Sequence, residues 1–115
     1  MRLLAVMFIA LVATMPAHAA AMRCDMSKKF ACTAGGCRDN AITGWNVVDF
    51  KTNRFSRCDR KGCDHYPMTV KRSGLFLNIE IPGRAMFAKM SVDGSKYLEV
   101  VSLGTSVLVS YGSCK

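Results

Sequence analysis

Apolar and polar residues alternate along most of the chain after Trp45, with the two-residue period of a β-strand that buries one face. The clearest example is segment 75–81, where leucine or isoleucine at every second position alternates with Phe76, Asn78 and Glu80. No segment keeps the period of about 3.6 residues that an amphipathic helix requires. The pattern therefore predicts an all-β protein.

Turn signals separate the alternating segments at intervals of about 8 to 12 residues, as they do in small β-sandwiches and barrels. Asp93-Gly94 is a strong one, because this dipeptide favours tight hairpin turns. Pro67 weakens the strand expected over 65–71 and indicates an edge strand or a bulge. Helix is the alternative for 85–92, but the turns on both sides leave too little room for one.

We therefore expect about six to eight short antiparallel strands, joined in sequence order as a meander. They would form a small barrel-like or curled sheet. The strands are expected at 28–33, 45–50, 54–58, 65–71, 75–81, 85–92, 96–103 and 106–111. Residues 34–36 are expected to form a turn, and residues 38–44 a loop.

The start of the chain has a different composition. Arg2 is followed by an unbroken apolar run over residues 3–12 and by the small-residue stretch Ala17-His18-Ala19-Ala20-Ala21. This is the layout of a secretory signal peptide that is cleaved near residues 19–21. We expect residues 1–21 to be this signal and residues 22–115 to be a single exported domain, periplasmic or secreted, without a further transmembrane segment.

All six cysteines lie in the exported part, at Cys24, Cys32, Cys37, Cys58, Cys63 and Cys114. An even number of cysteines in a small exported domain favours disulfides, because the core of such a domain is marginal by itself. We prefer two local bridges, Cys32–Cys37 and Cys58–Cys63, and a bridge from Cys24 to Cys114. The main alternative links Cys37 to the turn between Cys58 and Cys63. Four thiolates at C-x4-C spacing also suit zinc, but the oxidising compartment argues against a metal.

Basic residues are concentrated between positions 51 and 72, in a chain whose net charge is +8. They are Lys51, Arg54, Arg57, Arg60, Lys61, Lys71 and Arg72. We expect them to form a basic patch that binds an anionic glycan, an anionic lipid or an acidic protein, with nucleic acid the partner expected least. A solvated basic face without a ligand is the alternative. The oligomeric state is left open.

No motif indicates catalysis or a cofactor. His65 is the only histidine outside the expected signal, and its neighbour Asp64 would point to the opposite face of a strand. No carboxylate pair, glycine-rich phosphate loop or C-x-x-C redox motif is present. We therefore expect a non-enzymatic binding domain. Aromatic residues can stack on a ligand where they are exposed, and Phe76 is the best candidate.

The size, the export signal, the strand meander and the cysteines near both ends of the exported part resemble the small periplasmic inhibitors of c-type lysozyme. Asp93-Gly94-Ser95-Lys96-Tyr97 resembles the S-G-x-x-Y stretch of that family. The resemblance implies a β-barrel with its ends tied by a disulfide, and a protein inhibitor as the alternative function. Four further cysteines depart from that family, and a basic lysozyme would be repelled by this chain. A structural envelope protein is another alternative.

Overall fold

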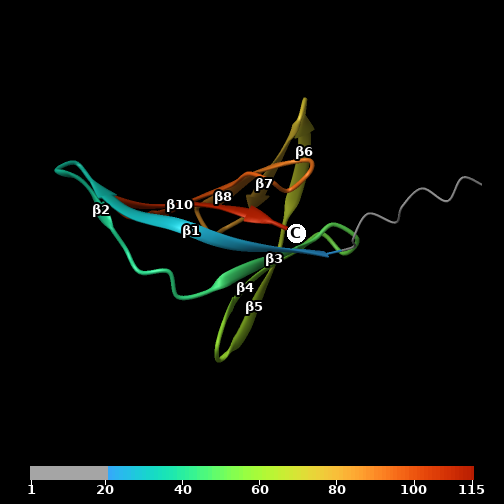
Figure 1. The fold of residues 1–115 in the computed structure, drawn as a ribbon, viewed down its shortest axis with the longest axis horizontal. Coiled ribbons are helices and arrows are strands. Elements are labelled where there is room, and N and C mark those ends of the chain that lie inside the picture. Colours follow the sequence, from blue (N-terminus) through green and yellow to red (C-terminus); the bar gives the residue numbers. More distant parts are fainter. Residues whose placement is uncertain (1–20) are drawn as a thin grey trace, which may run out of the picture.

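The computed structural model describes residues 21–115, which form one antiparallel sheet of ten strands (Figure 1). The strands are β1 (Ala21–Thr33), β2 (Gly36–Asp39), β3 (Trp45–Asp49), β4 (Arg54–Asp59), β5 (Gly62–Pro67), β6 (Thr69–Ser73), β7 (Phe76–Ile81), β8 (Met86–Ser91), β9 (Tyr97–Leu103) and β10 (Ser106–Cys114). This part of the chain contains no helix, and therefore none long and apolar enough to cross a membrane. The expected signal peptide lies outside the described residues except for Ala21, which already belongs to β1. The all-β prediction is confirmed.

β1 is the strand on which the two halves of the sheet are assembled. The strand order is β5-β4-β3-β1-β10-β9-β8-β7-β6, so β1 pairs with β3 on one edge and with β10 on the other. The expected meander in sequence order is right for β3 to β5 and for β6 to β10. It is wrong for β1, because the first strand is inserted between β3 and the last strand. Figure 1 shows blue β1 and red β10 side by side.

The sheet curls until its two edges meet. β5 and β6 are the outermost strands of the order, yet only Met68 separates them in the sequence. One residue spans about 3.5 Å, so the end of β5 and the start of β6 have to lie close together. Met68 is buried, and its N–H donates to the Asn53 carbonyl oxygen at 3.0 Å. Beyond this junction the β4–β5 and β6–β7 hairpins diverge, so the sheet is barrel-like without full closure (Figure 1).

Ten strands are more than expected, for two local reasons. Pro67 has no N–H and ends β5, so the single strand expected over 65–71 becomes two strands on opposite edges of the sheet. Residues 36–39, expected in a turn and a loop, form β2 and pair with the end of β1. Gly36 has a φ of 122°, which lets the chain reverse direction between β1 and β2.

The core lies on the inner face of the curled sheet. Its largest fully buried apolar side chains outside the disulfides are Val48, Phe55, Ile79 and Met90, from β3, β4, β7 and β8. The two-residue period of segment 75–81 is confirmed at its C-terminal end, since Ile79 and Ile81 are buried. Leu75 is exposed because it lies in the turn before β7.

All six cysteines form disulfides, in the preferred pairing Cys24–Cys114, Cys32–Cys37 and Cys58–Cys63. Each bridge joins two residues that face each other directly on antiparallel strands. The two local bridges clip the β1–β2 and β4–β5 hairpins. The third bridge is buried in the core and joins β1 to β10 across a sequence separation of 90 residues. Three disulfides agree with an oxidising, extracellular-type environment.

Replacing the long-range bridge with Cys24→Ala and Cys114→Ala should lower the free energy of unfolding by about 4–5 kcal/mol, or prevent folding. The same pair of changes at Cys58 and Cys63 should cost about 2 kcal/mol, because that bridge closes only a short loop. Urea denaturation of both variants measures the difference. Equal losses would contradict a dominant role for the β1–β10 bridge.

The Asp93-Gly94 turn between β8 and β9 is present as expected and is held by the Asp93 carboxylate. Its Oδ1 accepts hydrogen bonds from the Ser95 N–H at 2.9 Å, from Ser95 Oγ at 2.7 Å and from Ser91 Oγ at 2.8 Å. These bonds, with the Ser95 N–H the largest cause, lower the pKa of Asp93 from 3.8 to about 2. The ionised carboxylate therefore stabilises the turn.

This stabilisation should be complete above about pH 4 and should be lost as the pH falls toward 2, because the folded state holds the Asp93 proton less tightly than the unfolded state. Asp93→Asn should therefore be less stable than the parent protein at pH 5, and the difference should shrink at pH 2.5. Urea midpoints of both proteins at the two pH values test this. A difference that does not change with pH would count against it.

Candidate functional site

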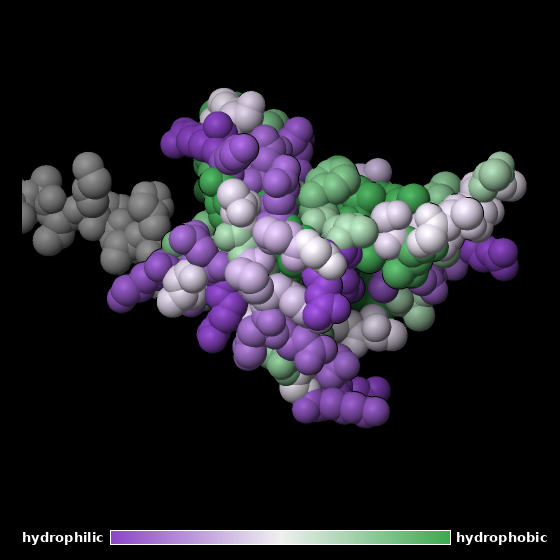
Figure 2. Space-filling model, turned by 180° about the vertical axis from the view of Figure 1, so that it is seen from behind, coloured by the Kyte–Doolittle hydropathy of each residue, from purple (hydrophilic) through white to green (hydrophobic). Residues whose placement is uncertain are grey.

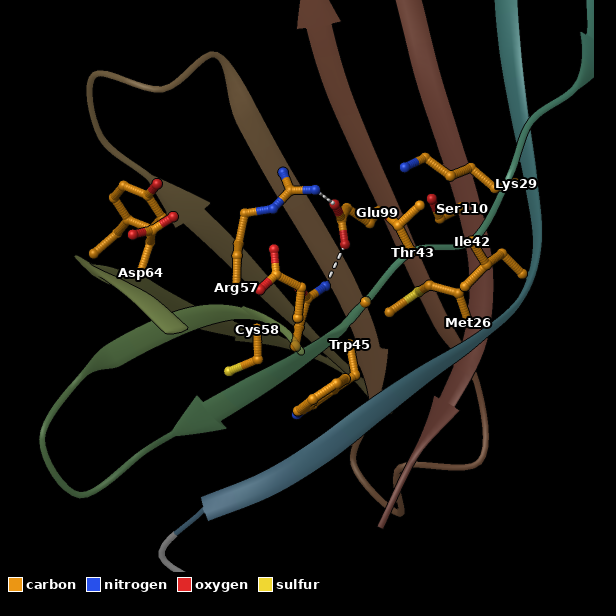
Figure 3. A pocket seen from close by; sticks show the side chains of 14 residues that line it. Met26, Lys29, Ile42, Thr43, Trp45, Arg57, Cys58, Asp64, Glu99 and Ser110 are labelled. Atoms are coloured by element: carbon orange, nitrogen blue, oxygen red, sulfur yellow. Dashed lines mark hydrogen bonds and ion pairs between the residues drawn. The ribbon is translucent and has the colours of Figure 1, made fainter. Parts of the chain in front are cut away.

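A polar pocket of about 350 Å³ opens where one edge of β1 loses its neighbouring strand (Figure 3). β3 pairs with the start of β1 and β2 with its end, so residues 26–29 between them lie against the 40–44 loop instead. Gly44 brings this loop against β4, since a Cβ atom at that position would clash with the Cys58 carbonyl oxygen. The pocket therefore follows from the way β2 and β3 share one edge of β1.

Strand register places two rows of polar side chains on the inner walls of the pocket. One row crosses β3, β4 and β5 and consists of Asn46, Arg57 and Asp64. The other row crosses β9, β10 and β1 and consists of Glu99, Ser110 and Lys29. The curl of the sheet turns the two rows toward each other, so residues far apart in the sequence line one pocket (Figure 3).

Glu99 is a buried carboxylate in this pocket, with 3% of its surface exposed. Its Oε1 lies 3.3 Å from Nη2 of Arg57, and its Oε2 accepts hydrogen bonds from Asn46 Nδ2 and Tyr97 Oη. Burial, and then the negative charge of Glu99, raise the pKa of Tyr97 well above its usual value, so the phenol keeps its proton. One cation and two hydrogen bonds therefore compensate the buried charge of Glu99.

Charges of both signs remain accessible from solvent. The Arg57 side chain is 36% exposed, Asp64 is exposed and Lys29 is half-buried. Figure 3 shows Asp64 and Lys29 on opposite sides of the pocket, with Arg57 and Glu99 between them. Within residues 21–115, neither Lys29 nor Asp64 is in an ion pair. Asp59 also lines the pocket, but its carboxylate already accepts the Lys61 N–H at 2.8 Å. The cation of Lys29 and the carboxylate of Asp64 therefore remain available to a polar molecule.

The seven basic residues of the expected patch lie in four separate places. Arg57 points into the pocket and is paired with Glu99. Lys51 and Arg54 lie at the β3–β4 turn, Arg60 and Lys61 in the β4–β5 turn, and Lys71 and Arg72 on β6. Figure 1 shows the β4–β5 turn and the far end of β6 at opposite ends of the molecule. The structure therefore brings together only those members that are already close in the sequence.

A different basic surface forms on the outer face of the sheet. One row across six strands, from β1 to β6, consists of Lys28, Tyr111, Leu98, Lys89, Asn78 and Lys71. The next row on the same face contains Phe30, Val109, Val100 and Phe87, with the carboxylates of Asp39 and Glu80 at its two ends. We name the surface of these strands the lysine–aromatic face and define it as Lys28, Phe30, Lys71, Phe76, Phe87, Lys89, Lys96, Leu98 and Tyr111. Only Lys71 belongs to the expected patch.

Three aromatic side chains of the lysine–aromatic face are open to solvent. Phe76 is 38% exposed, and Phe87 and Tyr111 are each 48% exposed. The prediction that Phe76 lies at the surface is confirmed, whereas Tyr97 is buried. Figure 2 shows apolar residues gathered between two projecting hairpins, β6–β7 and β1–β2. The two-residue period indicates which side chains point outward, but the joining of their strands depends on long-range pairing.

His65 lies beside a serine but does not form a catalytic triad. Its Nδ1 is 2.6 Å from Ser56 Oγ, and Ser56 is buried. Asp64 lines the pocket on the inner face of β5 and does not bond to His65, in agreement with the expected opposite orientation of neighbours on a strand. Residues 21–115 contain no group of three or more His, Cys, Asp or Glu side chains placed to hold a metal ion.

Arg57→Ala should lower the free energy of unfolding by about 2–4 kcal/mol at pH 8, because it leaves the Glu99 carboxylate buried without its cation. Urea denaturation at pH 8 measures this. Adding Glu99→Gln to Arg57→Ala should restore part of the loss, because the buried position then carries no charge, and no recovery in the double variant would contradict the ion pair.

Comparison with protein-family models, with curated proteins and with solved structures finds no match for this chain. The function therefore has to be inferred from the surface and the pockets of the protein itself.

Proposed function

We propose that this chain is a non-enzymatic, exported binding domain that docks on an anionic lipid surface through its lysine–aromatic face. The observation that carries the proposal is the row in which Lys28, Lys89 and Lys71 alternate with apolar and polar side chains across six strands. Aromatic rings and lysines are the side chains that favour the boundary between lipid and water.

Charge supports an anionic partner. Within residues 21–115, Arg23 and Arg57 are the only basic residues in ion pairs. The lysines of the face therefore keep their charges free, and each lysine near an anionic lipid surface contributes about 1 kcal/mol to binding. The exposed Phe87 and Tyr111 add apolar surface between these charges.

A shallow groove on this face suits an amphiphilic molecule. It has a volume of about 320 Å³, and its lining includes Phe76, Leu98 and Tyr111 together with Lys89 and Lys96. The Lys89 ammonium lies 5.5 Å from the centre of the Phe76 ring, which keeps a cation next to apolar surface. An acyl or glycerol group fits the apolar lining, while the lysines meet the headgroup phosphate.

Binding to phosphatidylglycerol vesicles, measured by co-sedimentation at low salt, tests the proposal. The triple variant Lys28→Gln, Lys71→Gln and Lys89→Gln should bind about 100-fold more weakly than the parent protein. Phosphatidylcholine vesicles should bind the parent weakly, and salt should weaken binding to phosphatidylglycerol.

The matched control is the triple variant Lys51→Gln, Arg60→Gln and Lys61→Gln. It removes the same number of charges from turns outside the lysine–aromatic face. It should retain most of the vesicle binding. Equal losses in the two triple variants would overturn the assignment to this face, as would full binding by the first variant.

A protein inhibitor is the second candidate, because the β4–β5 turn is a rigid basic tip. Cys58–Cys63 clips the hairpin, and the Asp59 carboxylate accepts the Lys61 N–H at 2.8 Å. Arg60 and Lys61 are both exposed on this tip. A preformed loop loses little conformational entropy when it enters an acidic cleft. Salt-resistant, stoichiometric binding to one acidic protein that is lost in the control variant would favour this candidate.

A further inference from the structure

The pocket between β1, β4 and β9 is a second site, independent of the lysine–aromatic face. Lys28 and Lys29 are neighbours on β1, and consecutive side chains of a strand point to opposite faces. Lys28 belongs to the outer row, whereas Lys29 lines the pocket. We infer that this pocket binds a small dipolar molecule of dipeptide size, with its carboxylate at Lys29 and its ammonium group at Asp64.

The charges that line the pocket favour a ligand with both signs. The lining holds two cations, Lys29 and Arg57, and three carboxylates, Asp59, Asp64 and Glu99. A purely anionic molecule would be repelled by the three carboxylates, and a purely cationic one would leave the Lys29 ammonium without a partner. A molecule that carries one charge of each sign avoids both penalties.

The arrangement of these charges gives the ligand an orientation. Arg57 and Glu99 are 3.3 Å apart and neutralise each other. Of the remaining charges, the Asp59 carboxylate accepts the Lys61 N–H at 2.8 Å. Lys29 and Asp64 lie on opposite sides of the pocket, without an ion pair in the described part of the chain (Figure 3). A zwitterion can bridge them with its two ends, while the buried Ser110 adds a polar group to the wall. A charge-assisted hydrogen bond at each end would hold it.

The volume of the pocket agrees with this class of ligand. About 350 Å³ lies at the lower end of the range of small-molecule sites in proteins. The hydrogen bonds of Glu99 with Asn46 and Tyr97 fix the buried side chains of Glu99 and Asn46, which form the floor of the pocket, before a ligand arrives. A preformed floor lowers the entropic cost of binding.

Titration of the isotope-labelled, oxidised protein with glycylglycine, followed by NMR, tests this inference. Amide shifts should change around the pocket, at the 40–44 loop and near Asp64. N-acetylglycylglycine lacks the ammonium group, and glycylglycinamide lacks the carboxylate. Each should bind at least about tenfold more weakly than glycylglycine. Equal binding of all three peptides, or no saturable shift in the pocket, would overturn the inference.

Variants at neighbouring positions provide the matched comparison. Lys29→Gln should weaken glycylglycine at least tenfold and should leave glycylglycinamide nearly unchanged, because only the former presents a carboxylate to position 29. Asp64→Asn should show the opposite selectivity, with N-acetylglycylglycine unaffected. Lys28→Gln should leave binding of all three peptides unchanged, and a loss there equal to that of Lys29→Gln would contradict the site. Vesicle binding of Lys29→Gln should equal that of the parent protein. The peptide titration and the vesicle assay therefore test the pocket and the lysine–aromatic face separately.

Discussion

The pairing of the first strand with the last is the interaction on which the rest of this fold depends. β1 and β10 run side by side for most of their length, and the buried Cys24–Cys114 disulfide joins them within the core. Without this pairing the chain would consist of two separate meanders, β3 to β5 and β6 to β10. Each would expose the apolar face that the other covers. The single residue Met68 between β5 and β6 then requires the joined sheet to curl.

The same strand also creates the pocket. Because β2 and β3 occupy different parts of one edge of β1, a gap remains that only the 40–44 loop borders. The interior beside this gap is reachable by water, which explains how Arg57, Asn46 and Glu99 can be placed inside so small a domain. The fully buried polar groups there have partners, since residues 21–115 contain no buried side-chain nitrogen or oxygen without a hydrogen bond. The cluster is therefore compatible with stability and leaves Lys29 and Asp64 free to meet a ligand.

The two sides of the sheet thus have different chemistry, and strand alternation is the cause. Lys28 and Lys29 on β1, or Leu98 and Glu99 on β9, are consecutive residues that serve opposite faces. The outer face combines separate lysines with exposed rings such as Phe87 and Tyr111, which suits a broad, anionic surface. The inner face combines opposite charges in a confined space, which suits a small dipolar molecule.

The sequence by itself determined the all-β class, the turn at Asp93-Gly94, the outward position of Phe76 and the two local disulfides, because each depends on residues a few positions apart. The link from Cys24 to Cys114 was also predicted, as a bridge that ties the two ends of the domain. The tertiary structure alone decided the place of β1, the division of residues 65–71 between two edges, and the separation of Arg60 from Lys71. It also assembled Arg57 with Glu99, and Lys28 with Lys89. These contacts depend on which distant strands become neighbours. Local residue patterns do not specify this pairing, because any two amphipathic strands can pair.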